Sequence, residues 1–573
     1  MRLSPPILVS SGRALAAGAA ALLVACGGGD GADAGRETAQ AAGDLLMTHA
    51  DATRLAHQAS FGPTYPLVTE LRRKGAPAWI AEQFALPSSS RYVRGGNDDI
   101  HEGSSGNSEF CAQAGHGGAN CWRDYYSNTP LVWDFYRNAV EGPDQLRQRV
   151  AYALQQILVV SNTTIESTYG LRNYHNNLLS LAFGNYGDIL RKVTLSPVMG
   201  DYLNHVNNDR VAPNENYARE LLQLFSIGTC RLELDGSLRG GSCQPTYDNN
   251  LVREYAFALT GWTYPAGGST PWGCWPQGAH CRYHRGDMVA VPSLHDQAER
   301  RLLGAAVVPA GSTPGEALTR VVNSLMAHPN AAPFVAKQLI QHLVTSNPSP
   351  AYVQRVATAF RDGRFQTFGA GRRGDMQATI ASILLDTEAR STPTATGGRL
   401  REPALLFTAT LRALNGRTDG DALGWWWGET LRQHLFRPPS VFNFYPADYP
   451  VPGTPLVGPQ FGIHNAGSAI DRMNFVTYLV WWGGSGAESD VPDALGTRVN
   501  LQPFDSYAAD PAALVDRMSN LAIGGRLPAA ARSAVITAVQ AYSPGVDPEN
   551  WVRNRVRQAA FLIYSSPNFQ IQR

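Results

Sequence analysis

The sequence has very little lysine and almost no net charge. Its 48 basic residues, of which only Lys74, Lys192 and Lys337 are lysines, are balanced by 47 acidic residues. Because such a chain has no bulk positive field, we expect no nucleic-acid partner. The chain also lacks a GxSxG elbow, an HExxH pair and a P-loop, and we expect no GxGxxG motif that is followed by a helix. Serine hydrolases, zincins and nucleotide-binding proteins therefore lose support.

The apolar stretch near the N-terminus is too short to span a bilayer. It runs from Ala14 to Ala25, whereas a spanning helix needs roughly 20 residues. A basic start, a short apolar core and small residues at its end predict a secretory signal peptide over residues 1–25. The stretch ends in Leu23-Val24-Ala25-Cys26, which resembles a bacterial lipobox. The alternative is an ordinary cleavage site after Ala25.

Cys26 is therefore the predicted lipid anchor, since acyl chains on its thiol can hold a protein on a bilayer without a spanning helix. Residues 26–45 are rich in glycine and alanine and predict a flexible tether. Gly27, and not an aspartate, follows Cys26, and by resemblance to Gram-negative sorting rules this favours the outer membrane. We expect a lipid-anchored cell-envelope protein with the membrane as one partner.

The other six cysteines form three couples that are close in sequence. An even number of cysteines in an exported chain is typical of disulfides. No couple has the two-residue gap of a zinc knuckle, so disulfides are favoured over a metal site. The predicted pairs are Cys111–Cys121, Cys230–Cys243 and Cys274–Cys281.

Helical periodicity dominates the chain, and strand-like alternation is sparse. Within residues 144–160, apolar positions recur on one stripe, and residues 185–195 and 332–344 have the same pattern. Ser349-Pro350 predicts a cap and a first-turn proline for a helix that continues to Phe360. These patterns predict a mainly α fold.

We expect residues 46–573 to form one large helical domain. Because single cores usually stop growing near roughly 250–300 residues, two closely packed lobes are the alternative. Residues 228–310 differ from the rest, with many glycines and prolines and two of the cysteine couples. This composition predicts a loop-rich, disulfide-stapled insertion with short hairpins.

The clearest predicted helix, residues 215–228 with Asn214 as its cap, carries a narrow polar strip. Its wider apolar arc predicts that the helix is deeply embedded. Carboxylates and a guanidinium at one-turn spacing either form ordinary solvated ion pairs or line a cavity. The strip consists of Glu215, Asn216, Arg219, Glu220, Gln223 and Ser226.

Two further Arg-Glu steps lie beside apolar segments. Arg253-Glu254 interrupts the predicted helix over residues 251–259, and Arg401-Glu402 precedes Pro403. Because charges in apolar segments are costly unless they are paired, one ionic network is expected to join the three steps. It serves either as structural support or as the lining of a pocket.

For the pocket interpretation, we expect Arg219 or Arg253 to lie beside Glu220 or Glu254. A carboxylate with a raised pKa is suited to acid–base catalysis, and an arginine is suited to binding an anionic group. The predicted catalytic residues are Glu215, Glu220 and Glu254, and the predicted substrate-binding residues are Asn216, Arg219, Arg253, Arg401 and Glu402.

A metal site is the weaker alternative, built from His280, His284 and His295. The first two are four residues apart, but the surrounding HCRYHRGD does not have a helical pattern. A metal site needs three or four converging ligands. The sequence indicates no particular cofactor.

Residues 437–446, RPPSVFNFYP, combine prolines with aromatic residues. This composition predicts a rigid, extended turn, which either walls a pocket or fills part of the core.

Several long segments resemble one bacterial family. They include PNENYARELLQLFSIG, ALTGW, REPALLF, RPPSVFNFYP, QLRQRVAYALQQILVVS and KQLIQHLVTSNPSPAYV. These segments are similar to the family of domain of unknown function 1800, over about residues 50–573. The resemblance implies a helix-rich exported protein with a co-secreted protein partner, and it transfers no catalytic residue. One departure is Glu299-Arg300, where relatives commonly carry Glu-Lys.

Two functions follow from these predictions. The first is an enzyme that acts on an envelope or extracellular polymer through the carboxylate- and arginine-lined pocket. The second is a non-catalytic scaffold or assembly factor that works with the co-secreted partner. A cleft with several charged side chains would favour the enzyme, and a large exposed apolar patch would favour the scaffold.

Overall fold

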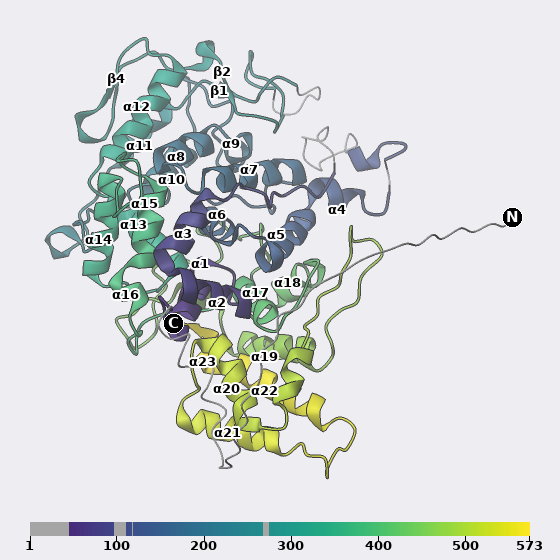
Figure 1. Ribbon diagram of the computed structural model, residues 1–573. Helices are drawn as coiled ribbons and strands as arrows, with labels where there is room; N and C mark the ends of the chain where they lie inside the picture. Colours follow the sequence, from purple (N-terminus) through teal and green to yellow (C-terminus); the bar gives the residue numbers. More distant parts are fainter. Residues whose placement is uncertain (1–44, 97–109, 117, 268–273) are drawn as a thin grey trace, which may run out of the picture. The chain divides into compact units, whose positions relative to one another are not determined.

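The structure, a computed structural model, describes residues 45–96, 110–116, 118–267 and 274–573 (Figure 1). Residues 46–573 form one compact unit that is mainly helical, as the sequence predicts. The signal peptide, Cys26 and nearly all of the tether lie outside the described residues, so export and lipidation remain predictions. In the described part of the chain, no helix is both long and apolar enough to cross a membrane.

The N-terminal helices pack around α6 (Gln145–Ile157), the helix predicted within residues 144–160. It contacts α3, α7 and α13, and it buries polar side chains, Arg149 and Gln156 among them. The other helices here are α1 (His49–Ala59), α2 (Tyr65–Lys74), α3 (Ala76–Ala85), α4 (Cys121–Tyr126), α5 (Thr129–Glu141), α7 (Thr168–Leu181), α8 (Tyr186–Thr194) and α9 (Pro197–Tyr202).

The helix predicted over residues 215–228 is shorter in the structure. Helix α10 (Asn216–Gln223) has Glu215, and not the predicted Asn214, as its N-cap residue, although the Asn214 side chain accepts a hydrogen bond from the backbone amide of Asn216. It ends early because the Ser226 hydroxyl bonds the carbonyl of Leu221 and Gly228 takes a left-handed φ of 72°. Tight turns therefore replace the last predicted turn of helix.

The insertion at residues 228–310 is loop-rich, as predicted. Besides helix α11 (Asn249–Ala258), it contains two short antiparallel pairs of strands and two of the disulfides. The strands are β1 (Trp262–Thr263) with β2 (Val289–Ala290), and β3 (Arg300–Arg301) with β4 (Val307–Val308).

The predicted cap at Ser349 is confirmed, because its side chain accepts a hydrogen bond from the Tyr352 amide at the start of α14. Pro350 opens this helix, and Gly363 ends it in a left-handed conformation. Helices α13, α14 and α15 pack on one another. This region contains α12 (Pro314–Ala327), α13 (Ala331–Leu343), α14 (Pro350–Asp362), α15 (Met376–Leu385), α16 (Thr387–Arg390) and α17 (Pro403–Ala413).

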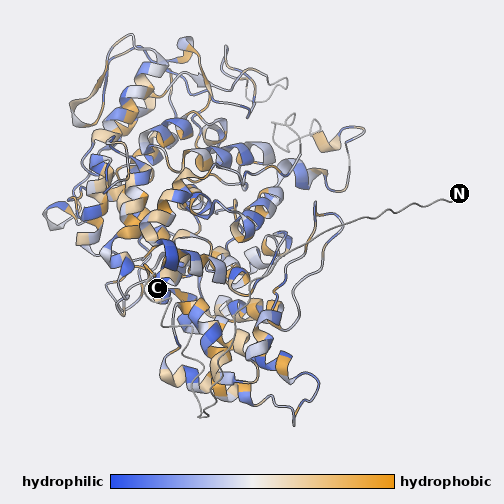
Figure 2. Ribbon diagram, in the orientation of Figure 1, coloured by the Kyte–Doolittle hydropathy of each residue, from blue (hydrophilic) through white to orange (hydrophobic). Residues whose placement is uncertain are grey.

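The C-terminal helices return the chain to its beginning, since α20 packs against α1. The last strand, β6 (Ile571–Gln572), pairs with β5 (Arg399–Leu400). Apolar and polar residues share most helices (Figure 2), as expected for helices that each bury one face. The helices are α18 (Trp427–Thr430), α19 (Ala466–Val480), α20 (Pro511–Ile523), α21 (Ala529–Gln540), α22 (Trp551–Tyr564) and α23 (Pro567–Gln570).

Candidate functional site

The first half of the polar strip of α10 lies at the surface, whereas Gln223 lines a cavity described below and Ser226 is buried. Arg219 Nη2 lies 3.0 Å from Glu215 Oε2, and both side chains are more than a third exposed. Arg219 also donates to Asn249 at the start of α11 (3.2 Å), and Asn216 donates to Asn204 (3.0 Å). These are ordinary solvated contacts.

Glu220 is the unusual member of the strip. Burial raises the pKa of its carboxyl, and the charge of Arg219 offsets that only in part. Its Oε2 is buried without a hydrogen-bond partner among the described residues. Glu220 also raises the pKa of Tyr202 and Tyr247, although burial is the larger cause for both. The carboxyl is therefore poorly compensated, but it does not line either of the two cavities described below.

Arg253 and Glu254 do not join the α10 strip. Glu254 pairs with Arg300 (3.2 Å), which also bonds Asp296 (2.6 Å) and lies 3.9 Å from the centre of the Phe257 ring. Arg253 is exposed. Of the predicted pairing of Arg219 or Arg253 with Glu220 or Glu254, the structure shows only the effect of the Arg219 charge on Glu220. The ion pair of Arg219 is with Glu215, and α11 turns Glu254 toward Arg300 of β3.

Arg401 and Glu402 are buried in the core. The Arg401 guanidinium donates to the Phe569 carbonyl (2.7 Å), contacts His57 (3.2 Å) and lies 4.5 Å from the centre of the Phe569 ring. Burial, followed by the charge of Arg399, lowers the pKa of Arg401 to about 9.

Glu402 is fully enclosed by partners. Its Oε1 lies 2.6 Å from Arg399 Nη2. Its Oε2 accepts from Tyr152 (2.9 Å), Gln433 (2.7 Å) and Tyr445 (2.8 Å). The ionic network predicted to join all three Arg-Glu steps is thus replaced by three separate sets of contacts.

The charge of Glu402 is stabilised by its surroundings. Burial alone would raise the pKa of this carboxyl, but Arg399 and Arg149 outweigh burial and lower the pKa to about 2. Burial, reinforced by Arg399, lowers the pKa of Arg149 to about 10. We define this set as the Glu402 cluster: Arg149, Tyr152, Arg399, Glu402, Gln433 and Tyr445.

The three predicted metal-binding histidines bond to different groups. His280 contacts the Tyr264 carbonyl (2.8 Å), His284 contacts Asp201 (2.9 Å), and His295 contacts the Thr260 carbonyl (2.8 Å). Within the described residues, no group of three or more histidine, cysteine, aspartate or glutamate side chains could hold a metal ion.

A cavity of about 380 Å³ lies beside the Glu402 cluster, a volume within the range of ligand sites, roughly 300–1,000 Å³. It is lined by the end of α6, the end of α10, one face of α13 and the segment 441–460. We call it the carboxamide pocket, after its six amide side chains: Gln156, Gln223, Gln338, Gln341, Asn443 and Gln460.

Two of these amides are buried with part of their hydrogen-bonding capacity unused. Gln156 accepts from Asn443 (3.0 Å), but its Nε2 has no partner among the described residues. Gln460, which is 1% exposed, has an Oε1 without a partner there. An unmet buried polar group is costly, and both side chains belong to the lining of the cavity.

His342 and Tyr445 connect the carboxamide pocket to the Glu402 cluster. The Tyr445 hydroxyl lies 2.8 Å from Glu402 and 3.2 Å from Gln156. The carbonyl of His342 accepts hydrogen bonds from Arg149 and Arg399. Burial, with Arg399 as the next cause, lowers the pKa of His342 to about 3, so its imidazole is neutral at neutral pH.

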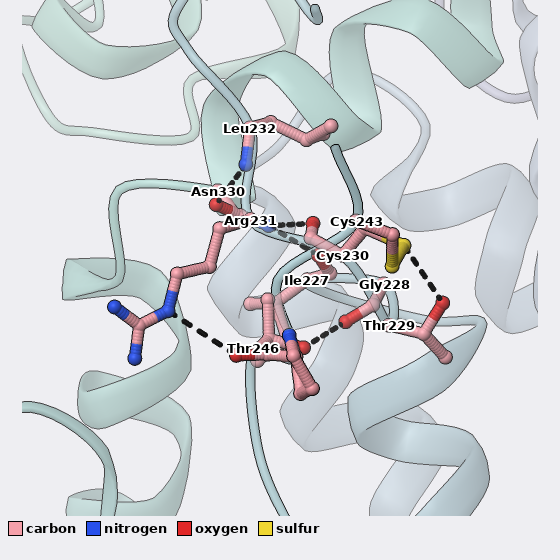
Figure 3. The surroundings of a disulfide bond; sticks show 10 residues. Ile227, Gly228, Thr229, Cys230, Arg231, Leu232, Cys243, Thr246 and Asn330 are labelled. Carbon is pink, nitrogen blue, oxygen red and sulfur yellow. Dashed lines mark hydrogen bonds between the residues drawn. A yellow bond between two sulfur atoms is a disulfide. The ribbon is translucent and has the colours of Figure 1, made fainter. Parts of the chain in front are cut away.

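A disulfide loop forms one wall of the carboxamide pocket (Figure 3). The three predicted disulfides are all present, and Cys230–Cys243 closes this loop. Asn330 binds the carbonyls of Ile227 and Cys230 and accepts from the Leu232 amide. The loop is therefore fixed at several points before any ligand binds.

Gly228 allows the disulfide loop to pass close to α13. A Cβ at this position would lie 2.6 Å from the Phe334 ring, and the backbone φ is positive. Both restrictions favour glycine. A side chain here would displace Phe334, which lines the carboxamide pocket.

One wall of this pocket was expected from the sequence, but its amide side chains were not. Residues 437–446, expected either to wall a pocket or to fill part of the core, do both, because Asn443 and Tyr445 line the pocket and are also buried. The lining residues Gln156, His342 and Gln460 were missed. The available signal was the pair of glutamines at the end of the strongly apolar 144–160 helix, where polar side chains must find partners.

The expectation that no GxGxxG motif is followed by a helix is wrong, because GAGRRG over residues 369–374 directly precedes α15. Such a motif resembles a dinucleotide-binding fingerprint. In the structure the motif is a turn, in which Gly374 bonds the Phe360 carbonyl and Asp375 caps α15. The strands of the described residues form only two-stranded sheets, so the parallel sheet that such a fingerprint requires is not found there.

The fold and the pocket define a large helical protein that is stapled by disulfides and has a cavity lined by amide side chains. The family described as Protein of unknown function (DUF1800) matches residues 54–571. The chain belongs to this family, as the sequence segments indicate. No curated protein and no solved structure matches the chain.

Most segments that resemble the family meet at this site. The carboxamide pocket takes residues from QLRQRVAYALQQILVVS, PNENYARELLQLFSIG, KQLIQHLVTSNPSPAYV and RPPSVFNFYP. REPALLF contributes Glu402, which Tyr445 contacts. The pocket and the cluster beneath it are therefore our candidate functional site.

Proposed function

We propose that this protein binds an uncharged peptide segment in the carboxamide pocket. The observation that carries the proposal is the presence of two buried amides, on Gln156 and Gln460, that each leave an atom without a partner. One offers a donor and the other an acceptor. A peptide bond presents the complementary pair, a carbonyl and an N–H.

The rest of the lining supports a peptide over a charged ligand. Apart from Lys337 and Asp448, its lining residues carry no formal charge, and apolar side chains line it together with the amides. A peptide likewise alternates amide groups with side chains, so it can satisfy both kinds of surface. The apolar and aromatic lining residues are Ile157, Leu224, Leu232, Phe334, Val441, Phe442 and Val457.

The test is calorimetric titration of the purified protein with the blocked tripeptide acetyl-Ala-Val-Ala-amide. We expect saturable binding, weakened about tenfold in Gln460→Leu, since one lost hydrogen bond is worth about 1 to 1.5 kcal/mol. Gln502, an exposed glutamine outside the pocket, is the matched control, and Gln502→Leu should bind normally.

Thermal melts of both variants separate loss of binding from loss of folding. Gln460→Leu should melt close to the wild-type protein, because the substitution removes an unmet buried polar atom. Preferential binding of an N-acetylglucosamine trimer would overturn the peptide assignment. Equal peptide affinity for Gln460→Leu and wild type would overturn the site.

Whether the bound peptide is chemically changed or stays intact distinguishes the two functions expected from the sequence. An enzyme acting on an envelope polymer would turn the peptide over, whereas an assembly factor would hold a segment of its co-secreted partner unchanged. His342 favours the enzyme, because its neutral imidazole lines the pocket and its Nδ1 has no partner in the described structure. Mass spectrometry of the peptide after incubation, with wild type and His342→Gln, decides between the two.

The proposed location is the outer membrane, through a lipid on Cys26. The support is the lipobox-like Leu23-Val24-Ala25-Cys26 at the end of the apolar stretch. Cys26→Ser should abolish acyl labelling and release the protein from membranes. A wild-type protein that stays on membranes without incorporating label would refute lipidation.

A further inference from the structure

A second cavity, of about 410 Å³, lies away from the residues of the carboxamide pocket. We call it the tryptophan cleft. Its indoles are Trp122, Trp425 and Trp426, each more than 40% exposed. Large aromatic side chains with this exposure are unusual unless they contact a partner or ligand.

The indoles of the tryptophan cleft are held in place. Trp425 donates to Thr129 (3.0 Å) and packs edge-on against His434. Trp426 stacks on Trp427, with ring centres 5.1 Å apart, and its edge meets Tyr478. The aromatic surface is therefore formed before a ligand arrives, which lowers the entropic cost of binding.

A disulfide bond helps to position Trp122. It lies on α4, which begins at Cys121, and the Cys111–Cys121 disulfide ties that end of the helix to residues 110–112. Its neighbour Arg123 pairs with Asp490 (2.8 Å) from the opposite wall.

The tryptophan cleft is strongly acidic. Four carboxylates, those of Asp419, Asp421, Glu488 and Asp490, line it together with the single guanidinium of Arg123. Asp419 is occupied by backbone amides of residues 495 and 496. Asp421 accepts from the Trp133 indole (3.0 Å), while Glu488 forms no ion pair with any described residue.

The charges in the cleft are not balanced. Burial raises the pKa of Asp421, and the nearby Asp419 and Asp490 raise it further against the effects of Trp133 and Arg123. A carboxylate whose pKa is raised by its neighbours lies where additional positive charge is favourable. A bound cation would relieve the repulsion.

We propose that the tryptophan cleft binds a quaternary ammonium group. Indole faces attract such cations through their quadrupole, and aromatic surfaces with acidic neighbours suit them. A primary ammonium is strongly hydrated and loses more on entering an aromatic site. An uncharged sugar could stack on the indoles and donate hydroxyl hydrogen bonds to the carboxylates, but it would not offset their negative charge.

The test is titration of the full protein with choline chloride, followed by tryptophan fluorescence. We expect saturable quenching that sodium chloride at equal ionic strength does not reproduce. Trp426→Ala and Glu488→Gln should each weaken binding at least fivefold. Glu488 is exposed, so its variant should fold even if Trp426→Ala does not.

Trp275→Ala is the matched control, because Trp275 is 80% exposed but does not line the cleft. It should bind choline normally. Vesicles of phosphatidylcholine distinguish a lipid headgroup from soluble choline as the source, and binding of either supports the site. Quenching that sodium chloride reproduces, unchanged affinity in Glu488→Gln, or binding of cellohexaose in place of choline would overturn the proposal.

Discussion

The dipeptide Arg-Glu has opposite roles at residues 219–220 and 401–402. On α10, Arg219 is 38% exposed and pairs with Glu215 across one helical turn. At the start of α17, Glu402 is fully buried and bonded by four side chains. The same dipeptide therefore contributes little to stability where its side chains are exposed and supports the core where they are buried. The residues that surround it in space determine which of the two occurs.

The largest expected effect is that of Glu402→Gln. Removing the charge leaves the buried guanidiniums of Arg399 and Arg149 uncompensated, so unfolding free energy should fall by about 3–5 kcal/mol. Urea denaturation of wild type and variant measures the change. An exposed ion pair contributes at most about 1 kcal/mol to stability. If Glu402→Gln lowers the free energy of unfolding by less than this, the buried pair at residues 401–402 does not differ in stability from the exposed pair on α10.

The pH dependence of unfolding should also report Glu402. The folded pKa of this carboxyl is about 2, below its ordinary value near 4.5 in an unfolded chain. Its stabilisation is therefore complete above about pH 4.5 and is lost as the pH falls toward 2. A shift of this size corresponds to on the order of 3 kcal/mol.

Denaturation midpoints between pH 6 and 2 measure this contribution. Wild type should lose stability more steeply than Glu402→Gln over the interval below pH 4.5. Parallel curves for the two proteins would mean that Glu402 is not held as a carboxylate in the folded state.

Arg300→Gln tests the intermediate case. Arg300 is 17% exposed and pairs with Asp296 and Glu254, so we expect a loss of roughly 1 kcal/mol. Arg219→Gln, at the more exposed pair, should cost less. Differential scanning calorimetry of both variants tests this order, and the reverse order would contradict the assignment by burial.

Glu220→Gln should have the smallest effect, and its sign should be opposite. Because the folded pKa of Glu220 is raised, its ionised form opposes folding at neutral pH. The variant should gain less than about 1 kcal/mol near pH 7, and the gain should vanish at acidic pH, where Glu220 is protonated. A large loss of stability would show that Glu220 supports the fold.

The features that could be predicted from the sequence are those that depend on residues close together in the chain, namely most helices and the disulfides. The apolar stripes of α6, α8 and α13 and the Ser349 cap of α14 are encoded within each segment, and each cysteine pairs with the one nearest to it in sequence. The partners of Glu402 could not be predicted, since Tyr152, Arg399, Gln433 and Tyr445 approach it from separate parts of the chain.

The candidate site was harder to predict for a related reason. Charged side chains are the most visible candidates for a site in the sequence, and the clearest group of them lies on the exposed part of α10. The carboxamide pocket is built from neutral amides on α6, α13 and the segment 441–460, which have no distinctive spacing. Only the tertiary fold makes Gln156 and Gln460 unusual, by burying them without full sets of partners.

The pairing of β6 with β5 has a consequence for the order in which the molecule can be assembled. Arg401 bonds the carbonyls of Phe569 and Gln570, and Gln572 pairs with Arg399. A nascent chain that has not yet exposed residues 569–572 lacks these partners for Arg401, although Glu402 and its other neighbours have already been synthesised. This part of the core is therefore completed only after residues 569–572 have joined it.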